Sequence, residues 1–366
     1  LIRIPGLALL LVVALLLPAP TASAQTFSIT VTSEDLQDGG TLSSPIKADG
    51  LNRLPDGRLV FFEDESDALV SYDPDAAVGS RTSIFRSASD IDADAGVDVD
   101  RIRAMTVDGD GNVYMSASDD TNTDLIYKTD GDTGVKLADA DGTNGMAVSA
   151  DGSTLYLGVV EFFDDSGNLD DGIYSVSTTG SDQTPQEVAT DGDLSIALGL
   201  DISDGVLYMV SDGFGGGDFE DAIVALDLGE QTPTFEAIVP ELCDDGVLSR
   251  NDEDCAINDI AVTPFNGTDR IVLYNGSFNA ANGEEVGKYD SDGTNGALIA
   301  TETDINNAVG SEVATTTRAL LASDDGTLFV ASRADFGGFE GILEIANAPL
   351  PVELTAFDVT TSGTAA

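Results

Sequence analysis

The sequence predicts an all-β protein with the architecture of a six-bladed β-propeller. Three observations lead to this prediction: a turn-and-strand unit recurs six times, further short β-rich runs follow each copy, and no long helix separates the copies. Repeats of about four short strands with Gly and Asp at their turns are typical of propeller blades. Since each blade packs against its neighbours, one such domain accommodates residues 25–348.

The recurring unit is an Asp-Gly or Asn-Gly turn followed by an apolar and aromatic strand. Such a turn between two β-rich runs is the strongest short hairpin signal, because a type I′ turn needs residues that accept positive φ. We therefore expect it to join the first and second strands of each blade. The copies span residues 54–62, 107–115, 149–157, 202–210, 265–274 and 323–331, and their equivalent positions are Leu59, Val113, Leu155, Leu207, Ile271 and Leu328.

The remaining strands follow the same order in every copy. Third strands are predicted at residues 68–73, 125–130, 172–177, 222–228, 285–290 and 341–346, and weaker fourth strands at places such as 81–85 and 185–189. The run FSITVTS, residues 27–33, precedes the first copy. We expect this run to complete the last blade and close the ring.

The first residues have the pattern of a secretory signal. Arg3 precedes an unbroken apolar run, residues 7–17, and the small-residue site Ala22-Ser23-Ala24 follows, with cleavage expected before Gln25. The run is shorter than the roughly 20 residues of a membrane helix, and no later segment approaches that length. We therefore expect residues 1–24 to be a signal peptide and the protein to be secreted, without a transmembrane segment.

The charge is strongly acidic, with 66 Asp plus Glu against 15 Lys plus Arg and a formal net charge of −51. Such a chain repels nucleic acid and anionic lipid, so neither is an expected partner. The acids are spread along the chain and 42% of residues are hydrophobic, which favours a folded domain with an acidic coat over a disordered one. We interpret this as a halophilic, monomeric protein; the alternative is a calcium-loaded surface protein.

Two absent residue types and one cysteine pair restrict the chemistry. The chain has no His and no Trp, which excludes a Ser-His-Asp triad and His-ligated zinc. Catalysis would have to use Asp, Glu, Tyr, Arg, backbone groups or a metal bound by oxygen. Cys243 and Cys255 bracket a short loop, which in an exported protein favours a disulfide; two free buried thiols are the alternative.

The inner strand of each blade starts at the mouth of the central channel, and counting back from the turn locates this corner. In chain order the corner residues are Asp49, Arg103, Asn144, Leu198, Asn258 and Arg318. Arg318, Asp49 and Arg103 come from consecutive blades and form, in one interpretation, an Arg-Asp-Arg cluster that only ties blades together. In the other, Arg103 and Arg318 bind a carboxylate or sulfate through forked hydrogen bonds.

The segments ADGLNRLPDGRLVFFED, TNGMAVSADGSTLYL and NDIAV resemble metal-binding corners of the regucalcin-like gluconolactonase family. The resemblance implies a divalent cation, calcium or another, on Asp49, Asn144 and Asn258, which would polarise a lactone carbonyl. The order of the last two corners is reversed relative to the family. Leu198-Gly199 stands where the family has its Asp ligand and base, and we expect Asp201 to face away from the channel.

Loops between second and third strands lie on the same rim as the corners. In one of them Asp164, Ser166, Asn168 and Asp170 alternate as oxygen donors, which suggests calcium or, alternatively, a solvated Asx-rich loop. Four phenylalanines in these loops form either an apolar binding rim or packing beneath the blade edges: Phe214, Phe219, Phe336 and Phe339. The calcium-like run DGDGN, residues 108–112, is explained by its place in a hairpin turn.

The last residues, 349–366, begin with two prolines that end the final blade. Within them LPVELTAF resembles the linker before C-terminal sorting modules of exported Bacteroidota-type proteins. The resemblance implies a linker or the start of a truncated sorting module, and attachment of the exported protein to the cell surface.

Three functions remain. The first is a binding or recognition module for a small acidic molecule or an extracellular protein or polymer. The second is a metal-dependent lactone or ester hydrolase, and the third a calcium-stabilised structural adhesin module. We favour binding because no complete catalytic set can be assembled from the sequence.

Overall fold

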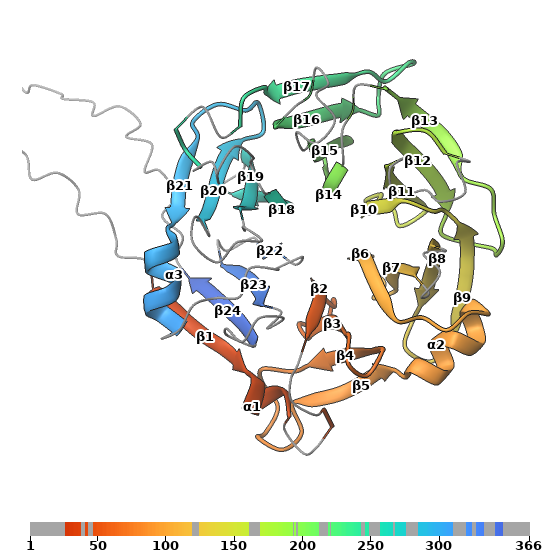
Figure 1. Ribbon diagram of the computed structural model, residues 1–366, viewed down its shortest axis with the longest axis vertical. Helices are drawn as coiled ribbons and strands as arrows, with labels where there is room; N and C mark the ends of the chain where they lie inside the picture. Colours follow the sequence, from red (N-terminus) through yellow and green to blue (C-terminus); the bar gives the residue numbers. More distant parts are fainter. Residues whose placement is uncertain are drawn as a thin grey trace, which may run out of the picture.

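The chain forms a ring of six antiparallel sheets around a central axis (Figure 1). Each sheet has four strands, so the prediction of an all-β, six-bladed propeller is confirmed. The computed structural model describes residues 26–37, 41–42, 47–118, 124–160, 169–192, 194, 197–211, 219, 221–242, 246–248, 257–265, 268–275, 285–309, 320–323, 327–332 and 341–346.

Five blades consist of four consecutive strands, ordered from the channel outward. Blade 1 is β2 (Ala48–Arg53), β3 (Leu59–Glu63), β4 (Ala68–Tyr72) and β5 (Thr82–Arg86); blade 2 is β6 (Arg101–Val107), β7 (Val113–Ser118), β8 (Asp124–Thr129) and β9 (Gly134–Asp139). Blade 3 is β10 (Thr143–Val148), β11 (Thr154–Val159), β12 (Gly172–Ser177) and β13 (Gln186–Thr190). Blade 4 is β14 (Ala197–Ser203), β15 (Val206–Ser211), β16 (Ala222–Asp227) and β17 (Phe235–Val239); blade 5 is β18 (Ile257–Phe265), β19 (Thr268–Asn275), β20 (Glu285–Asp290) and β21 (Ala297–Ala300).

The sixth blade combines strands from the two ends of the propeller. From the channel outward it consists of β22 (Leu320–Ala322), β23 (Leu328–Ser332), β24 (Gly341–Ala346) and β1 (Thr26–Thr32). β1 pairs antiparallel with β24, from Thr26 opposite Ala346 to Thr32 opposite Gly341. The expectation that the first strand closes the ring is therefore confirmed, and the six inner strands contact one another in an unbroken circle.

Among the described residues, the hairpin turns between first and second strands are of two kinds. In blade 4, Asp204 (φ 48°) and Gly205 (φ 82°) both have positive φ, as a two-residue type I′ turn requires. In blade 1 the turn is longer: the Gly57 amide donates to the Leu54 carbonyl at 2.9 Å, and Gly57 alone is left-handed. The type I′ prediction is wrong there, because the extra residues allow a type I turn followed by one left-handed glycine. Gly111 and Gly152 repeat the blade 1 pattern.

The hydrophobic core is divided among the junctions between blades. Successive residues of a strand point to opposite faces of its sheet, so neighbouring side chains pack against different blades. On β3, Phe62 packs with Met115 of blade 2, whereas Phe61 packs with Ile342 of blade 6. Both phenylalanines are fully buried, and truncating either to Ala is expected to cost about 3–5 kcal/mol. This two-sided burial explains why the second strands have apolar residues at consecutive positions.

Three helices connect blades: α1 (Ser33–Leu36), α2 (Ala88–Ala95) and α3 (Glu302–Val309). α2 begins after Ser87, whose hydroxyl accepts the Asp90 amide, and ends at the left-handed Gly96. Its buried Ile91 joins the core between blades 1 and 2. Within the part of the chain that the structure describes, no helix has the length and hydropathy to cross a membrane.

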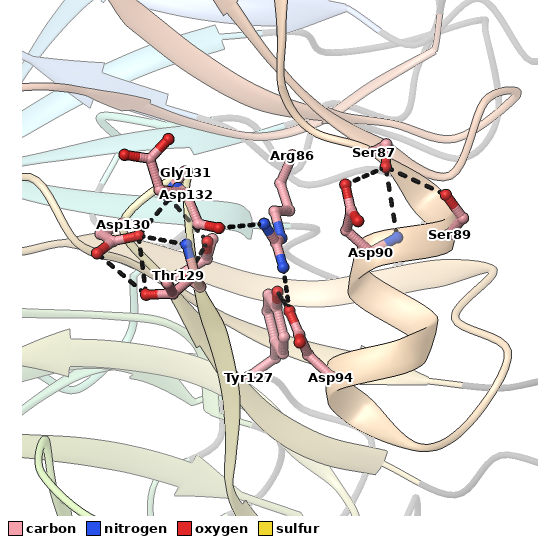
Figure 2. Close-up of polar contacts among 11 residues, drawn as sticks. Arg86, Ser87, Ser89, Asp90, Asp94, Tyr127, Thr129, Asp130, Gly131 and Asp132 are labelled. Atoms are coloured by element: carbon pink, nitrogen blue, oxygen red, sulfur yellow. Dashed lines mark hydrogen bonds and ion pairs between the residues drawn. The ribbon is translucent and has the colours of Figure 1, made fainter.

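A polar network reinforces this junction on its outer side (Figure 2). The Arg86 guanidinium, at the end of β5, forms an ion pair with Asp94 of α2 and donates to the Asp132 carbonyl at 2.7 Å. The Tyr127 hydroxyl of β8 donates to the same Asp94 carboxylate at 3.0 Å. Blade 1, α2 and blade 2 are thereby tied together at one carboxylate.

Candidate binding site at the channel mouth

Each of the first five inner strands has a β-bulge at the corner where it enters the channel. The register with the second strand shifts by one residue there, so that it skips one residue per corner. Bulges re-aim side chains and are frequent beside binding sites. The five residues that the strand register skips are Gly50, Arg103, Asn144, Gly199 and Asn258.

The observed register shows that two of the predicted corner residues are not equivalent to the others. Arg103, Asn144 and Asn258 occupy the bulge, but Asp49 and Leu198 lie one residue before it, because Gly50 and Gly199 take the bulge in blades 1 and 4.

Close packing against the next blade explains why glycine stands at these two bulges. A Cβ on Gly50 (φ +59°) would lie 2.9 Å from Met105 Cβ, and one on Gly199 (φ +69°) would lie 2.9 Å from the Ile260 amide nitrogen. Neither position accepts a side chain without a shift of the neighbouring inner strand.

Arg103 is held at its corner by a buried carboxylate. Its Nε lies 3.0 Å from Asp124 Oδ2, and the two side chains are 13% and 0% exposed. The Gly142 amide donates to the same oxygen at 3.0 Å, and the Ser118 hydroxyl donates to Oδ1. Burial raises the pKa of Asp124 to about 6, although the Arg103 charge opposes that increase. Asp124 was not among the predicted site residues, because an acidic residue at the start of a strand is usually exposed.

Asn144 lies on the adjacent corner, two residues after Gly142. The preceding Thr143 is fully buried; its hydroxyl donates to the Ala140 carbonyl at 2.8 Å, and its carbonyl accepts the Ser116 hydroxyl at 3.0 Å. The Asn144 side chain is partly exposed. Asp124 therefore links Arg103 of blade 2 to the segment that carries Asn144 of blade 3, and the two bulge residues sit on a rigid backbone.

The other predicted corner residues are described in part. Asp49 on β2 is buried, with 1% of its surface exposed. Asn258 lies on β18, but its side chain and the whole of Arg318 fall outside the described residues. The Arg318–Asp49–Arg103 cluster and the ligand roles of these residues therefore stay predictions.

Asp201 and Asp259 hold consecutive inner strands together at the channel. Asp201 accepts the amides of Ile202 at 2.8 Å and Val262 of blade 5 at 2.6 Å. Asp259 in turn accepts its own neighbour Ile260 at 2.8 Å and Leu320 of blade 6 at 2.7 Å. An inner strand has a partner on one side only, so alternate amides point toward the channel. Both carboxylates cap such amides.

The expectation that Asp201 faces away from the channel is therefore wrong. It assumed a regular strand, whereas the bulge at Gly199 reverses the alternation before Asp201. Burial raises the pKa of Asp201 to about 6 and that of Asp259 to about 7, and the negative charge of Asp201 adds to the second increase. Both side chains remain partly exposed.

The remaining candidate sites fall mostly elsewhere. Asp164, Ser166 and Asn168 lie outside the described residues, and so do Cys243 and Cys255. Asp170 is exposed, and its backbone amide donates to the Tyr174 hydroxyl at 3.0 Å. Among the residues that the structure describes, no group of three or more Asp, Glu, Cys or His side chains is arranged for a metal ion.

Two loop predictions can be examined directly. Phe219 packs edge-to-face on Phe235 with ring centroids 6.3 Å apart, which favours packing beneath a blade over an apolar rim at this position. The DGDGN run is a turn, as predicted: Asp108 accepts the Asp110 and Asn112 amides and the Tyr114 hydroxyl.

Comparison with known proteins identifies the fold and no family. No family model matches the chain, and no curated protein matches it in sequence. Many solved structures resemble it in fold.

Three of these structures are enzymes. A gluconolactonase from Xanthomonas campestris has a TM-score of 0.54 and 13% identity, covering 88% of this chain and 90% of that one. A carbohydrate-active enzyme of family AA12 from Trichoderma reesei, in a calcium structure, has a TM-score of 0.55 and 11% identity over 88% and 96% of the two chains. An ancestral GH74 enzyme has a TM-score of 0.51 and 12% identity; the match covers 82% of this chain and only 47% of that enzyme. At these identities the likeness shows the propeller fold alone.

Proposed function

We propose that this chain is a secreted binding propeller that takes a small acidic molecule at the channel mouth, with Arg103 as the principal contact. The observation that supports the proposal most directly is the fixed position of Arg103. Its guanidinium is oriented by the buried Asp124 and stays partly exposed at a bulge. The leader-like pattern of residues 1–24 supports secretion, and the net charge of −51 supports a saline environment.

A guanidinium has five N–H donors in a rigid fork, and the ion pair with Asp124 engages it at Nε. The geometry of this fork matches the two oxygens of a carboxylate or sulfate. Asn144, on the adjacent bulge, adds an amide that both donates and accepts. A preorganised Arg keeps more of its binding energy because less side-chain freedom is lost on association.

Asp124 makes the proposal dependent on pH. When Asp124 is ionised, the Arg103–Asp124 pair is neutral overall. Because burial raises the pKa of Asp124 to about 6, protonation below that pH removes one negative charge beside Arg103. An acidic ligand is therefore expected to bind more tightly at about pH 5 than at about pH 8, provided that its own carboxylate stays ionised.

The test is calorimetric titration with glucuronate and with sulfate in about 1 M sodium chloride, which screens the acidic coat. Arg103→Gln is expected to weaken binding about tenfold or more, since a charge-assisted hydrogen bond is lost. Arg58→Gln is the matched control: it removes the same charge on the opposite rim, where Arg58 pairs with Asp56. Equal binding by wild type and Arg103→Gln would contradict the proposal.

The second candidate is a metal-dependent lactone or ester hydrolase, and the placement of Asp201 at the channel favours it. Of the residues implied by the family resemblance, the structure describes the side chains of Asp49 and Asn144. These two oxygen donors fall short of the six to eight that calcium takes. The described donors therefore do not make up a metal site, and we derive no step through a metal. Hydrolysis of δ-gluconolactone by the purified chain with added calcium, abolished in Asp201→Asn, would favour this function over binding alone.

A further inference from the structure

A groove of about 370 Å³ lies between blades 2 and 3, on the rim opposite the channel mouth. The first-to-second-strand turns are on that rim, because each inner strand starts at the mouth and ends at its turn. The groove lies between the end of β8, the start of β9 and the end of β12. It is lined by Asn112, Lys128, Thr129, Asp130, Thr133, Gly134, Val135, Thr178, Thr179 and Gly180.

The two walls of the groove are joined by backbone hydrogen bonds. The connection between β12 and β13 runs beside β9, where the Gln183 amide donates to the Leu137 carbonyl at 2.6 Å and the Asp182 amide donates to the Lys136 carbonyl at 3.3 Å. The groove is therefore formed before any ligand arrives, as small-molecule sites usually are.

The Lys128 ammonium is held in place at the groove and has more N–H donors than this contact uses. Its ammonium donates to the Thr178 carbonyl at 3.0 Å and lies 5.4 Å from the centre of the Tyr114 ring. Tyr114 is fully buried and its hydroxyl donates to Asp108 at 2.8 Å, so the ring is held as well. An ammonium has three N–H groups, and the bond to Thr178 uses one of them.

The lining selects a class of ligand. Seven of its ten residues have polar side chains, which disfavours an apolar molecule. Asp130 lines the groove together with Lys128, and Asp108 accepts the Tyr114 hydroxyl, so the local charge disfavours an anion. The Asp130 carboxylate already accepts the Asp132 and Thr133 amides, so it mainly contributes charge. The Asn112 amide gives one N–H to Asp108 and has a second N–H and an oxygen, the Lys128 ammonium donates, and the Thr179 hydroxyl both donates and accepts. The volume is at the lower end of the range for small-molecule sites, roughly 300–1,000 Å³.

We propose that this groove is a second binding site, which takes a neutral pyranose sugar or a short oligosaccharide. Alternating hydroxyl donors and acceptors on a sugar ring match the mixed donors and acceptors of Lys128, Asn112 and Thr179. Gly134, Val135 and Gly180 leave room for the ring itself. This site is independent of Arg103, so each proposal can fail without the other.

Saturation-transfer NMR in about 2 M sodium chloride, which screens surface charge, tests the site with methyl glycosides of glucose, galactose and mannose. Binding of at least one glycoside is expected, weakened about tenfold in Lys128→Met, which keeps the stem and loses the donors. Thr179→Trp fills the groove from an exposed position and is expected to abolish binding without disturbing the fold. Lys47→Met is the control, since Lys47 pairs with Glu65 on the other rim.

Three results would overturn the proposal: no transfer from any glycoside, equal binding in wild type and Thr179→Trp, or binding of sodium acetate in place of the sugars. Loss of binding in Lys47→Met to the same degree as in Lys128→Met would also overturn it, because a general charge effect would then explain the change.

Discussion

The junctions of blades 4, 5 and 6 differ from the junction of blades 1 and 2 in where the carboxylates that connect the blades lie. In the former, Asp201 and Asp259 connect inner strands beside the channel by accepting backbone amides. In the latter, Arg86 and Tyr127 meet Asp94 on the outside of the ring, through α2. Among the residues that the structure describes, the inner carboxylates are held by backbone amides without an ion pair, whereas the outer contact is an ion pair. We therefore expect the stability provided by the inner contacts to change with pH, and the stability provided by the outer contact to fall when Arg86 is removed.

The largest effect is expected from removing both inner carboxylates. Asp201→Ala/Asp259→Ala leaves four inner-strand amides without their acceptors, and we expect the free energy of unfolding to fall by about 4 kcal/mol, at 1–3 kcal/mol per lost carboxylate. Urea denaturation in about 2 M sodium chloride measures it. Asp75→Ala removes an exposed carboxylate from a turn and serves as the control. A loss no greater than in the control would show that channel water replaces both acceptors.

A smaller effect is expected on the outer side of blades 1 and 2. Arg86→Met leaves Asp94 without its ion pair, in surroundings where the two side chains are 11% and 25% exposed. We expect a loss of about 2 kcal/mol, below the 3–5 kcal/mol of a fully buried pair. The same denaturation experiment applies. If Arg86→Met destabilised the protein more than the double Asp variant, the ranking of inner over outer contacts would be wrong.

The smallest change in the free energy of unfolding is expected from a change of pH, and it further distinguishes the inner contacts from the outer one. At about pH 8, Asp201 and Asp259 are ionised in the folded and unfolded chain alike. As the pH falls through their folded pKa values of about 7 and 6, the folded chain takes up protons, while the unfolded chain does so only near pH 4. Stability should therefore rise by about 1–2 kcal/mol between pH 8 and pH 6.

Burial shifts the pKa of Asp67 and Asp124 in the same direction, to about 6. Asp151 is different, because hydrogen bonds from Ser153 and Ser149 lower its pKa to about 2, outside this window. Denaturation curves at several pH values check the expectation, and the slope should be reduced in the double Asp variant. A stability that is constant or falls on acidification would contradict it.

The blades could be predicted from the sequence, but the corners only in part. The second strands are apolar at successive positions because Phe61 and Phe62 face different blades, and such runs stand out in a sequence. The bulges leave no such pattern. Whether Asp49 or Gly50 occupies the bulge depends on the close packing of Gly50 against Ile102 and Met105 of the next blade. These two residues lie outside the first sequence repeat, so the repeat alone does not indicate the choice.

The roles of Asp124 and Asp201 could not be predicted from the sequence for the same reason, because they depend on bulges and on contacts between separate strands. Asp124 is recognisable as a partner of Arg103 only once β8 and the Gly142 turn are placed beside it. Asp201 was assigned to the wrong side because one unpartnered residue reverses the alternation of every residue after it.

The pairing of β1 with β24 also constrains the order of folding. The strand made first, from Thr26, finds its partner only when the strand ending at Ala346 exists. Until then the first blade has no sixth blade to cover Phe61, and the circle of inner strands stays open. Ring closure therefore waits for nearly the whole chain, and such distant pairing is slow because a long loop must close first. A propeller of this design therefore completes its fold only after its last strand has been made.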